Sequence, residues 1–136
     1  MPTLRTRATA AFTVLALVII AACLAFNHAW KLADVRHKAE ALTGGNVERG
    51  RQAFIGAGCG GCHTLEGVTQ ANGLVGPPLD GIAERAIIAG KLANNPANMS
   101  RWISSPQSVV PGNAMPDMQL STQETNDIAA FLYTRT

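Results

Sequence analysis

A run of nineteen residues without a charge, residues 8–26, limits the folds open to this chain more than any other feature. A helix rises about 1.5 Å per residue, so the run would reach about 28 Å, close to the thickness of a bilayer core at about 30 Å. Trp30 and Lys31 follow the run, where interfacial anchors are expected. The sequence therefore predicts that residues 1–28 form an anchor that crosses a membrane once.

Two other interpretations of this segment remain open. A cleaved signal peptide has an apolar region of about 7–15 residues, which is shorter than this run. Residues 20–23, Ile-Ala-Ala-Cys, resemble a lipobox with Cys23 as the lipidated residue, but the apolar stretch continues beyond Cys23. An uncleaved anchor accounts for the full length of the run, and Cys23 is then a small apolar residue facing lipid.

The rest of the chain divides into a stalk and a domain. Residues 29–43 favour a helix and carry both signs of charge, which predicts a helical stalk. Gly44 and Gly45 break this pattern and open a domain at residues 44–136. The domain carries six basic and seven acidic side chains, so it offers no basic patch and we expect no nucleic-acid partner.

The pattern within the domain is helical, with long loops. Asn95 precedes a proline and is expected to cap a helix, and Ser121 with Glu124 forms a capping box that opens a last helix. No run shows strong strand alternation, so the sequence predicts an all-α domain. Earlier helices are expected at residues 47–55, 82–89 and 97–104.

The strongest chemical motif is Cys59-Gly60-Gly61-Cys62-His63. Residues three and four apart share one face of a helical turn, so both thiols and the imidazole point the same way. Two thiols can then join the two vinyl groups of a haem while the imidazole reaches the iron. This spacing is typical of c-type haem attachment and predicts one covalent haem c with iron.

Two other uses of this motif are weaker. A zinc site needs about four ligands, whereas the domain holds only these two cysteines and one histidine. A thiol–disulfide redox motif expects a βαβ setting, which the helical pattern of the domain lacks.

The domain resembles class I cytochrome c over residues 47–134. Gly50 and Phe54 are similar to the first helix of that family, in which the glycine lets the last helix cross closely. Residues 76–81, Gly-Pro-Pro-Leu-Asp-Gly, are similar to the family's G-P-x-L-x-G loop. The resemblance implies three to five short helices around one haem, and a Pro77 carbonyl that accepts the second imidazole N–H of His63.

Residues 111–116, Pro-Gly-Asn-Ala-Met-Pro, are similar to the family's run up to its axial methionine. The resemblance implies that Met115 is the sixth iron ligand, opposite His63. Pro116 agrees with this assignment, because the residue before a proline is pushed towards extended geometry. Met118 is a nearby rival for the same role.

Two further residues are assigned to the site by this resemblance alone. The family places an aromatic side chain beside the methionine sulfur, and Trp102 falls at that position, although core packing would also explain it. Asn113 falls where a side chain can donate a hydrogen bond to a haem propionate.

An iron bound by His63 and Met115 has no open position, so the resemblance implies an electron carrier with no catalytic residue and no small-molecule substrate. Methionine opposite histidine raises the potential, which favours a quinol-oxidising complex as donor and a terminal oxidase or another redox enzyme as acceptor. The sequence is most similar to small membrane-anchored cytochromes and to the cytochrome domain of some oxidase subunits II.

A fixed haem subunit of a larger oxidase or dehydrogenase is the alternative, and a catalytic or sensing haem protein is a more distant one. The resemblance implies haem attachment outside the cytoplasm. We therefore expect a bacterial inner-membrane protein whose haem domain lies on the periplasmic face.

Overall fold

The computed structural model describes residues 4–136, so the first three residues of the predicted anchor lie outside the described part. The chain begins with one uninterrupted helix, α1 (Leu4–Thr43). Anchor and stalk are therefore parts of the same helix. The helix ends at Gly44, whose φ of +68° is a left-handed conformation that glycine adopts without strain.

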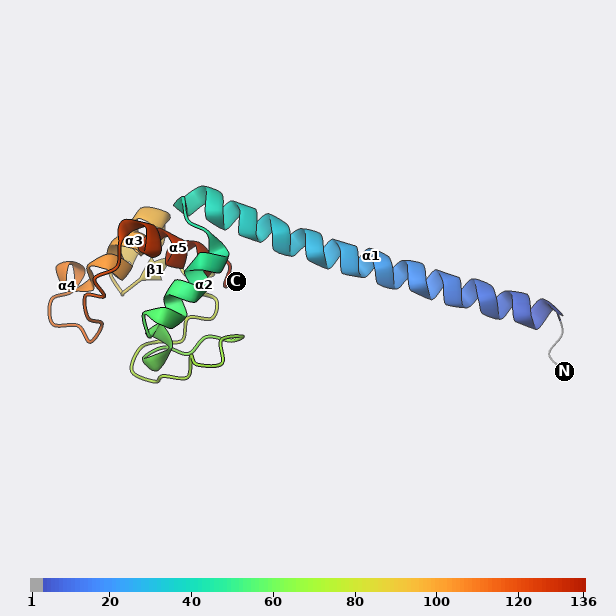
Figure 1. The fold of residues 1–136 in the computed structure, drawn as a ribbon, viewed down its shortest axis with the longest axis horizontal. Coiled ribbons are helices and arrows are strands. Elements are labelled where there is room, and N and C mark those ends of the chain that lie inside the picture. The colour runs from blue at the N-terminus through green and yellow to red at the C-terminus, as the bar shows by residue number, and fades with distance from the viewer. Residues whose placement is uncertain (1–3) are drawn as a thin grey trace. The chain divides into compact units, whose positions relative to one another are not determined.

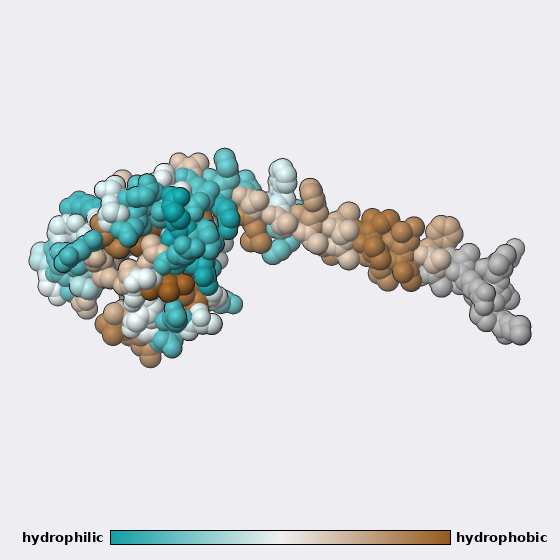
Figure 2. Space-filling model, viewed as in Figure 1, coloured by the Kyte–Doolittle hydropathy of each residue, from teal (hydrophilic) through white to brown (hydrophobic). Residues whose placement is uncertain are grey.

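The apolar part of α1 is long enough to cross a membrane. Its large apolar side chains, such as Phe12 and Phe26, are exposed over more than two thirds of their surface. They form the brown band along the helix in Figure 2. An exposed apolar surface of this length is costly in water and suits a lipid environment, and the chain thus carries one candidate transmembrane helix.

The contacts between residues divide the chain into two compact units, with the boundary between Val35 and Arg36. The last two turns of α1 thus belong to the same unit as the domain. Within it, Ala39 is only 2% exposed. Glu40 Oε1 accepts hydrogen bonds from Asn46 Nδ2 (3.0 Å) and from the Val47 backbone N–H (2.9 Å). The end of the predicted stalk is therefore integrated into the domain.

The core of this unit is the crossing of α2 (Val47–Gly56) with α5 (Thr122–Leu132), which lie side by side in Figure 1. A Cβ atom at Gly50 would collide with the backbone carbonyl of Asp127, so only glycine permits this close approach. Phe54 and Phe131 pack against each other with ring centroids 5.6 Å apart. The glycine-mediated crossing inferred from the sequence is thus confirmed.

Asp127 links the start of α2 to α5. Its carboxylate is 3% exposed, accepts two hydrogen bonds from Arg49 (2.8 and 2.9 Å), and accepts one from the Asn46 backbone N–H at 2.7 Å. Gln123 donates a fourth hydrogen bond. Burial alone would raise the pKa of Asp127, but these donors outweigh it and hold the pKa below its ordinary value.

The remaining helices are set by local signals. Asn95 caps α3 (Pro96–Ser104) by accepting the Asn98 N–H, as expected. The predicted capping box is also confirmed, because Ser121 and Glu124 each accept the backbone N–H of the other at the start of α5. A short helix, α4 (Pro106–Val109), follows α3 and was not predicted.

The helix expected at residues 82–89 is wrong. Only a single 3-10 turn, η2 (Ile82–Glu84), forms there. It is followed by a two-stranded antiparallel hairpin, β1 (Ile87–Ile88) with β2 (Leu92–Ala93). Ile88 is buried, and this packing outweighs the local helical preference. Apart from this hairpin and one isolated bridge, the ordered elements of the described residues are helical, so the predicted all-α class holds.

Candidate functional site

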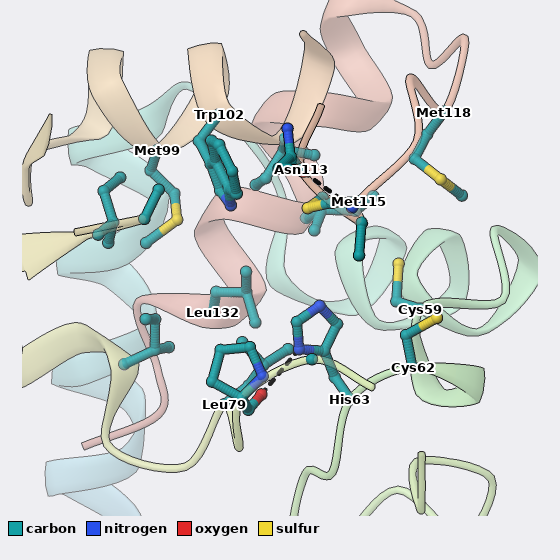
Figure 3. Close-up of a pocket in the computed structure, with 18 of the residues that line it drawn as sticks. Cys59, Cys62, His63, Leu79, Met99, Trp102, Asn113, Met115, Met118 and Leu132 are labelled. Carbon is teal, nitrogen blue, oxygen red and sulfur yellow. Dashed lines mark hydrogen bonds between the residues drawn. The ribbon is translucent and has the colours of Figure 1, made fainter. Parts of the chain in front are cut away.

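A cavity of about 630 Å³ lies inside the domain, between the C-x-x-C-H turn and the loop that follows α4. Its lining is mostly apolar. Figure 3 shows His63 and the two cysteines on one side and Met115 on the other. All seven residues predicted for the site line this cavity: Cys59, Cys62, His63, Pro77, Trp102, Asn113 and Met115.

The C-x-x-C-H motif forms a tight turn that begins as η1 (Cys59–Gly61). The Cys59 carbonyl accepts the N–H of Cys62 at 3.2 Å and the N–H of His63 at 3.0 Å. This single turn carries both thiols and the imidazole to the cavity, as the spacing predicts. Gly60 lets the following loop pack closely on this turn, because a Cβ there would collide with the backbone of Gln70 and Ala71.

The thiol chemistry at this turn does not fit the two alternative uses of the motif. Burial raises the pKa of the Cys59 thiol to about 11, whereas a reactive redox cysteine needs a lowered pKa. Within residues 4–136, no cluster of three or more histidine, cysteine or carboxylate side chains is arranged to hold a metal. A zinc site would need about four such ligands.

The imidazole of His63 is held by the loop after the motif. Its Nδ1 lies 2.7 Å from the Pro77 carbonyl oxygen. A carbonyl can only accept, so Nδ1 carries a proton and donates it in this bond. The ring also lies directly over Gly76, where a Cβ would come within 2.6 Å of Nδ1. His63 is thus held through Nδ1, and Nε2 is the ring nitrogen that can bind a metal ion in the cavity.

Arg85 is a site residue that the sequence analysis missed. Its guanidinium donates to the carbonyls of Pro78 and Asp80, and so braces the loop that holds His63. It is also the one arginine or lysine side chain in the cavity lining. No motif marks Arg85, because its partners are backbone carbonyls whose positions depend on the fold.

The other side of the cavity is formed by the loop of residues 110–118. Met115 and Met118 both line the cavity. Figure 3 shows Met115 across from His63, while the side chain of Met118 points away from the imidazole. Within the loop, Asn113 Oδ1 accepts the Met115 N–H at 2.8 Å, and Asn113 Nδ2 donates to the Val110 carbonyl. Asn113 therefore orders the methionine loop, a role that the sequence analysis did not anticipate.

Two side chains of α3 complete the site. Met99 is 2% exposed and packs in the core, as expected of a methionine on this helix. Trp102 is half-buried and extends towards the cavity between Met99 and Met115 in Figure 3. The cavity thus combines two thiols, one imidazole and one facing thioether within apolar walls. This donor set fits a flat, apolar, iron-containing macrocycle attached through cysteine.

The comparisons with known proteins agree with this chemistry. The sequence model of the family described as "Cytochrome c" matches residues 47–136. Cytochrome c oxidase subunit 2 of Alkalihalophilus pseudofirmus is 37% identical over 101 residues, covering 74% of this chain and 28% of that protein.

Two further relatives carry the same name. The subunit of Bacillus sp. PS3 is 34% identical over 71 residues, covering 51% of this chain and 20% of that protein. The subunit of Bacillus subtilis is 30% identical over 90 residues, covering 63% and 25%. The chain therefore spans about a quarter of the length of these relatives. No solved structure matches the chain significantly.

Proposed function

The chain belongs to the cytochrome c family and carries a covalent haem c, and we propose that it transfers single electrons through an iron held between His63 and Met115. When bound, the haem supplies an iron that gains and loses one electron reversibly. The observation that carries the proposal is the His63–Pro77 hydrogen bond, which engages Nδ1 and makes Nε2 the nitrogen that can bind the iron. Met115 faces this imidazole across the cavity.

The residues of the chain divide the work of holding this group. Cys59 and Cys62 provide the covalent attachment, and the Pro77 carbonyl fixes the tautomer and plane of the His63 ring. Met115 would hold the iron from the side that faces His63, so that neither oxygen nor a substrate would find an open site. Carrying electrons, rather than catalysing a reaction on a bound substrate, is the function that such a closed site supports.

The cavity walls set the environment of the iron. Apolar side chains such as Ile103, Ile128 and Leu132 exclude water, and a dry, methionine-ligated haem has a raised potential. Arg85 contributes the positive charge in the lining and can offset the negative charge of haem carboxylates. Trp102 lines the cavity between Met99 and Met115 and would limit the movement of the sulfur.

Helix α1 supplies the membrane attachment in this proposal. We place the haem domain on the outer face of a bacterial inner membrane, with Arg5 and Arg7 on the cytoplasmic side, in line with the positive-inside tendency. A tether raises the effective concentration of membrane partners. The donor would be a quinol-oxidising complex and the acceptor a terminal oxidase or another redox enzyme.

The names of the relatives favour a second candidate, in which the chain is a fixed haem subunit of an oxidase. Purification of the full chain from membranes in mild detergent distinguishes the two. A tethered carrier should separate from the oxidase subunits, and its haem should be reduced by quinol only when the quinol-oxidising complex is added back. Constant one-to-one recovery with oxidase subunits would overturn the carrier proposal in favour of the fixed subunit.

A further inference from the structure

Gln107, in the first turn of α4, makes three hydrogen bonds to the backbone of the loop that carries Met115. Its Nε2 donates to the Asn113 carbonyl (2.9 Å) and to the Met115 carbonyl (2.8 Å). Its Oε1 accepts the Gly112 N–H at 3.0 Å. The side-chain amide has two N–H donors facing two carbonyls and one oxygen facing an N–H, so its orientation is fixed by its partners.

These bonds complete the fixation of Met115. Asn113 Oδ1 accepts its N–H, and Gln107 Nε2 donates to its carbonyl. Both backbone polar groups of the methionine are thus held by side chains that lie two and eight residues before it. Pro116 restricts the conformation of Met115 further, because the residue before a proline avoids helical geometry. The backbone of Met115 is therefore ordered by the protein itself.

We propose that Gln107 is a positioning residue that keeps the Met115 sulfur on the haem iron. The inference rests on the proposed role of Met115 as sixth ligand, and Gln107 acts only through that residue. A loop held by three hydrogen bonds loses little further entropy when its methionine binds, so ligation is favoured. Without the bonds, the loop would sample open conformations and the sulfur would leave the iron more often.

The test uses the full-length protein with its haem, in detergent. The oxidised wild type should show the weak sulfur-to-iron absorption band at the red edge of the visible spectrum, and its reduced form should take up carbon monoxide slowly. Carbon monoxide binds only when the sulfur has left, so its rate reports the open fraction. Gln107→Ala should weaken the band and speed carbon monoxide binding about tenfold or more. The reason is that the loss of one net hydrogen bond changes the open fraction about tenfold.

Two further variants separate positioning from general damage. Gln107→Glu keeps the shape and the acceptor for Gly112 but has no N–H for the two carbonyls, so it should behave like the alanine variant. Ser108→Ala removes the bond from Ser108 Oγ to the Ser105 carbonyl in the same helix and touches no atom of the methionine loop. It should keep the wild-type band and rate.

The outcomes identify which claim fails. If the wild type has no sulfur-to-iron band, the assignment of Met115 is wrong and the inference falls with it. If the wild type has the band, and both Gln107 variants keep its amplitude and the slow carbon monoxide rate, the inference is wrong while the proposed function stands. An equal loss of the sulfur-to-iron band in Ser108→Ala would also overturn the inference. Gln107 would then act only by stabilising α4, and not by holding the methionine loop.

Discussion

The Nδ1 atom of His63 lies 2.7 Å from the carbonyl oxygen of Pro77, fourteen residues later in the chain. This contact uses Nδ1 as a donor, because a carbonyl oxygen can only accept. The other nitrogen is thereby left as a metal ligand. Gly76, immediately before Pro77, is the residue that allows the ring to pack against this loop.

Gly76→Ala should displace the imidazole. The added Cβ would lie 2.6 Å from Nδ1 and 2.8 Å from Nε2, closer than side-chain contacts allow. We expect a sharp fall in the yield of haem-containing protein, measured as the ratio of haem absorbance to total protein. Gly56→Ala is the control, since a Cβ there meets no atom within 4 Å and alanine favours a helix by about 0.5–1 kcal/mol. A normal yield of haem-containing protein for Gly76→Ala would show that the loop can move aside without displacing the imidazole.

Met115→Ala should abolish the sulfur-to-iron band of the oxidised protein, and Met118→Ala should keep it. The reason is that Met115 faces His63 while Met118 points away from the ring. The near-infrared end of the absorption spectrum measures both variants under the same conditions. Loss of the band in Met118→Ala, with the band kept in Met115→Ala, would move the ligand to Met118.

Asp127→Asn should destabilise the domain in a pH-dependent way. The pKa of Asp127 is lowered in the folded state, so its contribution is complete above the ordinary carboxyl pKa of about 3.9 and is lost as the pH falls through the folded value. At pH 7 we expect the free energy of unfolding to fall by about 2 kcal/mol or more, since each bond to a charged group contributes about 1.5–3 kcal/mol. Chemical unfolding of the wild type and of Asp127→Asn at pH 7 and below pH 3 measures this difference in the free energy of unfolding.

The control for this experiment is Asp117→Asn, which changes an exposed carboxylate. Asp117→Asn should change the free energy of unfolding little at either pH. A difference between wild type and Asp127→Asn that is the same at both pH values would contradict the charge-dependent role of Asp127.

Glu40→Ala should also destabilise the domain, although Glu40 lies on α1, in the segment expected to be a stalk. The change removes the acceptor of the Asn46 side chain and of the Val47 N–H. We expect a loss of about 1–2 kcal/mol in the free energy of unfolding. Glu66→Ala, at an exposed position in a loop, is the matched control. An unchanged stability would mean that the domain begins at Gly44, as the sequence predicts.

The features that could be predicted from the sequence are those that depend on neighbouring residues. The caps at Asn95 and Ser121 need only a side chain and an N–H three residues away. The C-x-x-C-H turn needs only one turn of backbone. Gly50 was identified through the family resemblance, because a single glycine in a helix does not by itself reveal which chain crosses it.

The features that were missed depend on packing and on the conformation of irregular loops, which no fixed short spacing marks. At residues 82–89 the local preference is helical, but Ile88 is buried in the core and Ala89 adopts a φ of +53°, so a hairpin forms. Arg85 and Gln107 act on backbone carbonyls that come together only after folding. Unlike a helix cap, these bonds reach across five to eight residues of irregular loop, so neither residue stands out before the structure is known.

The most direct test of the account is whether the iron has an open position. The reduced full-length protein, with its haem attached, is exposed to carbon monoxide at neutral pH and its visible spectrum is followed over minutes. We expect almost no change, because His63 and Met115 would fill both axial positions. Rapid and complete formation of a carbon monoxide complex in the wild type would contradict it and would point instead to a catalytic or sensing haem.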